Sequence, residues 1–140
     1  RTHTLRLKAS AEGAAFEVGD FIVRVGALFF NSNVSEGTLV EIEYKPCASA
    51  SDAGVLLREF LWLVLDAARA HGGSTQREEL PSGEAPWDDP AAMAALGEWA
   101  PDFVTVGNEV PNTSMLPSTF SRQHAALQFD AMLRKLINIE

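Results

Sequence analysis

Two β-patterned runs joined by a short polar loop constrain the fold more than any other feature of the sequence. In Asp20–Phe30 and Thr38–Tyr44 the side chains alternate between two faces, and the intervening residues are rich in Asn, Ser and Gly. This pattern predicts an antiparallel hairpin. Pro46 ends the second run because it has no backbone N–H to donate. Gly26, inside the first run, predicts a bend or a close approach of two backbones.

An apolar helix is predicted over Ala53–Ala70, directly after the hairpin. Apolar residues recur at helical spacing and cover most of its circumference, so the helix is either deeply buried or lies between its own sheet and a partner. Ser49-Ala50-Ser51-Asp52 has the Ser-x-x-acid pattern of a helix start, with Ser49 or Ser51 as the cap. Gly72-Gly73 predicts where the helix ends.

The N-terminal residues carry a weaker strand pattern. Thr4–Lys8 alternates apolar and basic residues, as a half-buried strand does. Ala9–Ala15 is small and polar, with Gly13 as a candidate turn residue. Phe16–Val18 begins another strand or closes the first hairpin.

Three further elements are predicted toward the C-terminus. Proline at a first helical position predicts a short helix over Ala91–Trp99, begun by Pro90. Phe103–Val106 is predicted as a short strand. Helical spacing of apolar residues predicts a last helix over Phe120–Asn138. The sequence thus predicts an α+β fold with an antiparallel β-sheet and two main helices, in a single domain over residues 1–140.

The segment Ser74–Pro117 is rich in Pro, Gly and acids, and we interpret it as an acidic insertion or a mobile loop. Between Glu78 and Glu109 there is no Lys or Arg, and the whole chain has a net charge of −8. Direct nucleic-acid binding needs clustered bases to displace counterions from phosphate, so it is not expected. An alternative is a free-standing adaptor that binds its partners through this acidic segment.

Glu41 and Glu43 form the one candidate site with catalytic precedent. Two carboxylates on one strand face could hold Mg²⁺ or Mn²⁺, as in tunnel-type triphosphate-processing metalloenzymes, which also need a ring of bases around the phosphates. The strands offer only Arg6, Lys8 and Arg24 for that ring. We therefore favour a solvated strand face and keep the metalloenzyme as an alternative.

No other residues suggest chemistry. His3, His71 and His124 follow no metal-ligand spacing, and terminal, helix-capping and helix-surface roles account for them. Cys47 is the only cysteine, which excludes an internal disulfide and favours a reducing compartment. No run approaches the roughly 20 apolar residues of a membrane span. No enzyme activity, cofactor, metal or membrane association is expected.

The run Phe16–Phe60 resembles the C-terminal half of the Mediator subunit 20 family. In that family an Asp-Phe strand ending in Val-Gly is followed by a Val-Glu-x-Glu-Tyr strand, a Pro-Cys step and a helix led by Ser-Asp. The residues that carry the resemblance are Asp20-Phe21-Ile22-Val23-Arg24-Val25-Gly26, Val40-Glu41-Ile42-Glu43-Tyr44-Lys45-Pro46-Cys47, Ala50-Ser51-Asp52 and Leu56-Leu57-Arg58-Glu59-Phe60.

The resemblance implies that the sheet is part of a barrel flanked by the two main helices. It also implies a non-catalytic, nuclear role in the Mediator head module, where this subunit pairs with subunit 18 and helps couple transcription regulators to RNA polymerase II. From their position beyond the main apolar stripes, we predict that Phe29, Phe30, Trp62 and Leu65 face a partner.

Overall fold

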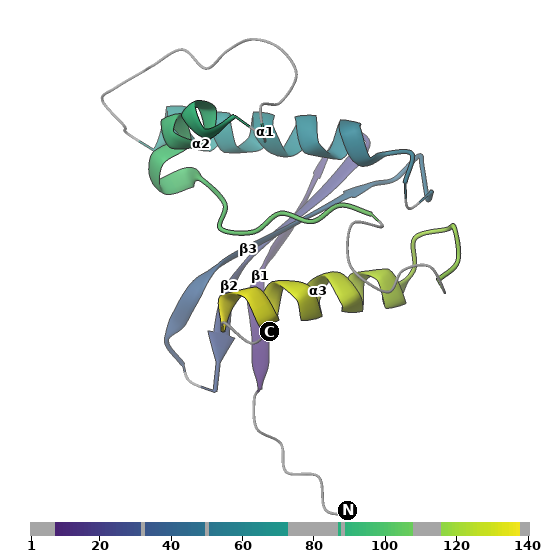
Figure 1. Cartoon of the computed structure of the whole chain (residues 1–140), viewed down its shortest axis with the longest axis horizontal. Helices are drawn as coiled ribbons and strands as arrows, with labels where there is room; N and C mark the ends of the chain where they lie inside the picture. The colour runs from purple at the N-terminus through teal and green to yellow at the C-terminus, as the bar shows by residue number, and fades with distance from the viewer. Residues whose placement is uncertain are drawn as a thin grey trace, which may run out of the picture. The chain divides into compact units, whose positions relative to one another are not determined.

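The computed structural model describes residues 8–31, 33–49, 51–72, 87, 89–107 and 116–137. These residues form two compact units, Arg1–Pro46 with the sheet and Cys47–Glu140 with the helices. Figure 1 labels their strands and α-helices. In chain order they are β1 (Ala9–Val18), β2 (Phe21–Phe30), β3 (Ser35–Tyr44), α1 (Gly54–His71), α2 (Pro90–Leu96), the 3₁₀ helix η1 (Gly97–Trp99) and α3 (Arg122–Leu136). The α+β class is confirmed, while the single domain stays a prediction.

The sheet unit is an antiparallel three-stranded sheet in the order β1-β2-β3. The predicted hairpin is confirmed as β2 and β3, although β3 begins earlier than predicted and includes Ser35. Gly19, with φ of 58°, makes the tight turn between β1 and β2. The register shifts between Leu28 and Phe29, where β3 carries an extra residue opposite β2. Among the described strands the sheet is open and is not closed into a barrel.

Strand β1 corrects the prediction for the N-terminal residues. Ala9–Ala15 was expected to be small and polar with a turn at Gly13, but it forms the greater part of β1. Gly13 lies directly opposite Gly26 of β2, and a Cβ on Gly13 would lie only 1.9 Å from the Val25 carbonyl oxygen. The prediction that Gly26 marks a close backbone approach is therefore confirmed. The strand predicted over Thr4–Lys8 lies outside the described residues except for Lys8, which is not in a strand.

Helix α1 confirms the predicted apolar helix, but its start differs. The N-cap is Ala53, and no side chain caps the helix. The predicted caps are wrong because their hydroxyls are used nearby: Ser51 Oγ donates to Asp52 Oδ1 at 3.1 Å and lies 3.5 Å from Ser49 Oγ. The helix ends as predicted at Gly72, whose backbone N–H donates to the Ala68 carbonyl at 2.8 Å.

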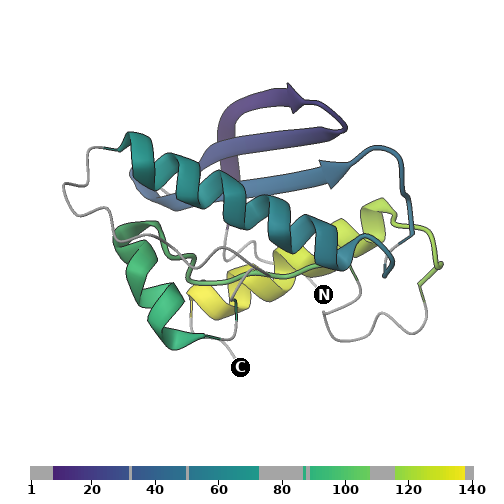
Figure 2. The same cartoon turned by 90° about the horizontal axis from the view of Figure 1, so that it is seen from above.

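The predicted short helix is confirmed as α2 and η1. Asp89 caps it by accepting a hydrogen bond from the Ala91 N–H at 2.9 Å, and Pro90 occupies the first turn. Both elements pack at the C-terminal end of α1, as the two views in Figures 1 and 2 show. The core at this contact consists of Trp62, Ala92 and Leu96, surrounded by Leu65, Trp87, Met93, Trp99 and Ala100.

Helix α3 confirms the predicted last helix. The segment before it pairs with the segment before α1, because Phe120 N–H donates to the Ala48 carbonyl and Ser49 forms a β-bridge with Thr119. The strand predicted over Phe103–Val106 is wrong, since these residues do not adopt strand structure. They form an irregular segment in which Val106 is buried.

Candidate interaction surfaces

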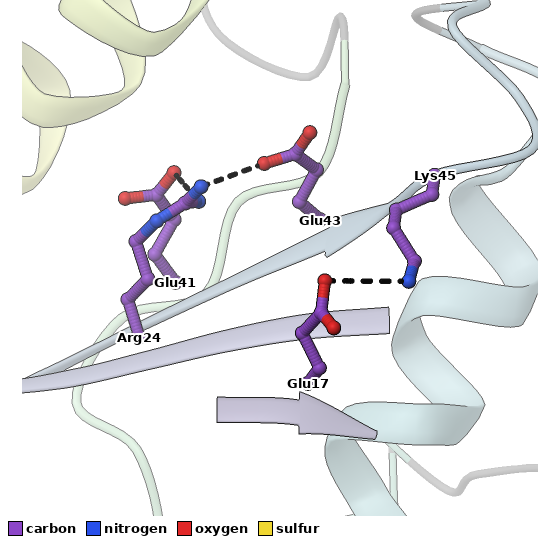
Figure 3. A network of polar contacts seen from close by, with 5 residues as sticks. All are labelled: Glu17, Arg24, Glu41, Glu43 and Lys45. Atoms are coloured by element: carbon purple, nitrogen blue, oxygen red, sulfur yellow. Dashed lines mark hydrogen bonds and ion pairs between the residues drawn. The ribbon is translucent and has the colours of Figure 1, made fainter. Parts of the chain in front are cut away.

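The sheet presents a polar face built from all three strands. Residues directly opposite each other on neighbouring strands share a face, and the register sets Arg24 opposite Glu41 and Ile22 opposite Glu43. Arg24 Nη1 donates to Glu41 Oε1 and Nη2 to Glu43 Oε2, both at 2.9 Å (Figure 3). The single guanidinium therefore joins the two carboxylates that the sequence marked as a candidate metal pair.

Each carboxylate of this face lies beside a cation, although Glu17, Glu41 and Glu43 outnumber Arg24 and Lys45 by one. The hydrogen bond to Glu43, more than any other effect, raises the pKa of Arg24 above its ordinary value, and the negative charges of Glu41 and Glu43 add to it. Beside this network, Lys45 Nζ lies 3.6 Å from Glu17 Oε1 (Figure 3).

The geometry favours the solvated strand face over a cation site. The side chains of Glu41 and Glu43 are 57% and 51% exposed, and the positive charge between them is the Arg24 guanidinium. A divalent cation would have to displace that group before both carboxylates could bind it. Among the described residues no group of three or more His, Cys, Asp or Glu side chains could hold a metal ion.

The opposite face of the sheet is apolar and exposed at its β1 side. Its cross-strand rows run Val18–Phe21–Tyr44 and Phe16–Val23–Ile42. Val23 is buried, but Phe16 is 55% exposed and Val18 is 50% exposed. Phe16 and Val18 were not among the predicted partner-facing residues. The signal that could have found them is the alternation of apolar residues, which continues from β2 back into Phe16–Val18.

The four residues predicted to face a partner do not form one surface. Phe29 and Phe30 are half-buried near the end of β2, in the sheet unit. Trp62 is buried in the core of the helix unit and contacts Trp87 edge-to-face, with ring centroids 5.5 Å apart. Leu65 packs against the same core. Whether any of the four contacts another protein stays a prediction.

His124 corrects a prediction, because it is not a helix-surface residue. It is 0% exposed, and its Nδ1 accepts a hydrogen bond from the Ser121 backbone N–H at 3.1 Å. The Ser121 hydroxyl lies 3.0 Å from the same nitrogen, and the Phe120 ring stacks on the imidazole. This is a capping arrangement at the start of α3. His71, by contrast, is exposed in the last turn of α1.

Comparison with known proteins identifies a family for this chain. Residues 2–134 match a family model described as the TATA-binding related factor of subunit 20 of the Mediator complex. The chain belongs to the Mediator subunit 20 family. No solved structure is a significant match. Within the part of the chain that the structure describes, no helix is long and apolar enough to cross a membrane.

Curated relatives of the subunit 20 family come from insects and mammals. A Mediator subunit 20 from Aedes aegypti is 42% identical over 60 residues, which are 43% of this chain and 27% of the relative. The Drosophila melanogaster protein is 31% identical over 97 residues, 69% of this chain and 34% of the relative. The Homo sapiens protein is 41% identical over 54 residues, 39% of this chain and 25% of the relative. The chain therefore spans only about a quarter to a third of these relatives.

Proposed function

We propose that the chain is a non-catalytic part of Mediator, in the head module, where it pairs with subunit 18 and helps couple transcription regulators to RNA polymerase II in the nucleus. Family membership supports a Mediator role. The exposed apolar face of the sheet supports a role through protein contact, and it is the observation that carries the proposal. Large apolar side chains grouped on an accessible face mark interaction sites more often than isolated ones do.

The exposed side chains and open edge of β1 support a sheet that continues beyond the described strands. Phe16 and Val18 are exposed on β1, which is an edge strand with no described neighbour on its outer side. Edge strands offer unpaired N–H and C=O groups that further strands can use. A part-barrel completed by additional strands would both cover Phe16 and Val18 and satisfy this edge.

The polar face supports a non-catalytic role. A tunnel metalloenzyme would use Glu41 and Glu43 as metal ligands, but both carboxylates accept hydrogen bonds from Arg24. Contacts to other proteins need an apolar centre, and the exposed Phe16 and Val18 on the opposite face of the sheet offer one.

Co-purification with subunit 18 and the other head-module subunits tests the proposal. Phe16→Asp should abolish pairing, because it places a charge on the exposed part of the apolar face. Glu17→Ala is the matched control, since Glu17 is the next residue of β1 and belongs to the polar face. Wild-type protein that ignores every head-module subunit, or equal pairing by both variants, would refute the proposal.

A further inference from the structure

Helix α1 carries an exposed apolar stripe beside its core contact. Trp62 and Arg69 are the buried residues of this helix. About a quarter to a third of a turn around it, Leu63 is 63% exposed and Leu56 is 38% exposed. A helix face in water is normally polar. We call the exposed apolar residues of this face the α1 outer stripe; they are Leu56, Leu63, Ala67 and Ala70.

Acidic residues follow one border of the α1 outer stripe. Glu59 and Asp66 are seven residues apart, and so are Leu56 and Leu63. Seven residues are close to two helical turns, so each pair lies along one side of the helix. Asp66 pairs with Arg69 at 3.2 Å, whereas no base among the described residues pairs with Glu59. The stripe therefore combines an apolar ridge with a negative border.

We propose that the α1 outer stripe is a docking site for an amphipathic, basic helix of a partner protein. A helix whose apolar residues repeat every seven positions would pack along Leu56, Leu63 and Ala70. Lys or Arg on its flank would pair with Glu59 and Asp66, which fixes orientation and speeds association. The small side chains of Ala67 and Ala70 let the partner approach closely at the C-terminal end of α1.

Charge decides between this occupant and a second copy of the chain. In an antiparallel pair of α1 helices packed through the α1 outer stripe, the acidic borders of both copies would lie on the same side of the contact. Like charges there oppose association, and each copy has a net charge of −8. The inference goes beyond the proposed function, because it follows from α1 alone and does not depend on which complex supplies the helix.

Binding to synthetic helices tests this surface with the full 140-residue chain. The probe is a three-heptad peptide with Leu at its core positions and Lys on both flanks, and its matched partner has Glu in place of each Lys. Fluorescence anisotropy should show that wild-type protein binds the Lys peptide and not the Glu peptide. Because a buried central anchor dominates such contacts, Leu63→Lys should weaken binding by about tenfold or more.

Two further variants make the test specific. Glu59→Lys should lower affinity for the Lys peptide by about two- to fivefold and raise affinity for the Glu peptide, as expected for one exposed charge pair. Leu136→Lys is the control, because Leu136 is an exposed apolar residue on α3, and its affinity should equal that of wild type. Far-UV circular dichroism checks folding, and Leu56→Lys replaces Leu63→Lys if the latter does not fold.

Three outcomes would overturn the inference. They are equal binding of both peptides, unchanged binding by Leu63→Lys or by its replacement, and sedimentation of wild type as a dimer that Leu63→Lys converts to a monomer. Co-purification with the head module is read separately. Protein that binds the Lys peptide but ignores Mediator subunits refutes the proposed function alone, and protein that joins Mediator but shows no peptide preference refutes only the docking site.

Discussion

Replacing Gly13 by Ala should destabilise the sheet unit, because the backbones of β1 and β2 lie too close for a side chain. A Cβ at this position would lie 1.9 Å from the Val25 carbonyl oxygen and 2.4 Å from the Gly26 Cα. Real Cβ atoms essentially never approach closer than 3.0 Å, so β1 must move by about 1.1 Å, the difference between 3.0 and 1.9 Å. Forced overpacking typically raises the free energy of the native state by about 1–3 kcal/mol. Ala also restricts the unfolded chain, which offsets about 0.5–1 kcal/mol. The difference is a net loss of about 0–2.5 kcal/mol, with a midpoint of about 1 kcal/mol.

Two other glycines provide graded controls. At Gly26 a Cβ would lie 3.1 Å from the Glu12 carbonyl oxygen, so a shift of a few tenths of an ångström suffices, and Gly37 has open space around it. In urea unfolding followed by circular dichroism, stability should fall in the order Gly37→Ala, Gly26→Ala, Gly13→Ala. Amide hydrogen exchange in β1 and β2 should show the same order. If Gly13→Ala is as stable as Gly37→Ala, the strands do not approach as closely as described and the reasoning is wrong.

Four further substitutions test the contacts in each unit. Arg24→Ala should lower the free energy of unfolding by about 0.5–1 kcal/mol, and by less at high salt, because its partners are exposed. The pKa of Arg24 is raised, so the side chain stays charged until the pH rises through that raised value. The loss should therefore be the same at pH 7 and pH 9 in a pH series of urea melts. His124→Ala should cost about 1–3 kcal/mol in thermal unfolding, since the partly buried Ser121 N–H at the start of α3 loses its acceptor. An unchanged melting temperature would contradict the capping role. In the same urea melts Trp62→Ala should cost about 3–5 kcal/mol, because Trp62 is buried. Leu63→Ala should cost less than about 0.5 kcal/mol, because Leu63 is exposed. Equal losses would mean that α1 is rotated from its described position.

The parts of the fold that sequence patterns predicted are those in which local preference and tertiary packing agree. The side chains of β2 and β3 alternate cleanly between two faces, and Pro46 and Gly72 follow the ends of β3 and α1. β1 was missed because Ala and Gly have low strand propensity and the residues of β1 have no strong alternation. Its conformation depends on pairing with β2, including the Gly13–Gly26 contact, which no local pattern contains.

The sequence predicted which carboxylates form the candidate site but not which side chain they bind. The sequence placed Glu41 and Glu43 on one strand face, but only the register brings Arg24 opposite Glu41. The capping position of His124 was missed for a related reason. The familiar capping box has Glu or Gln at the third helical position. Here the His124 imidazole supplies the acceptor. This role buries a side chain that composition alone assigns to the surface.

Helix α1 shows why the number of apolar residues in a helix does not reveal which of its faces is buried. Its sequence is apolar around most of its circumference, so periodicity alone could not say which side would pack inside the unit. Packing against α2 and η1 buries Trp62, which the sequence assigned to a partner, and leaves Leu63 exposed. Loss of binding after a change at Trp62 would therefore mix lost stability with lost contact. A change at Leu63 separates the two, because this side chain contributes little to the core and much to any helix that packs along α1.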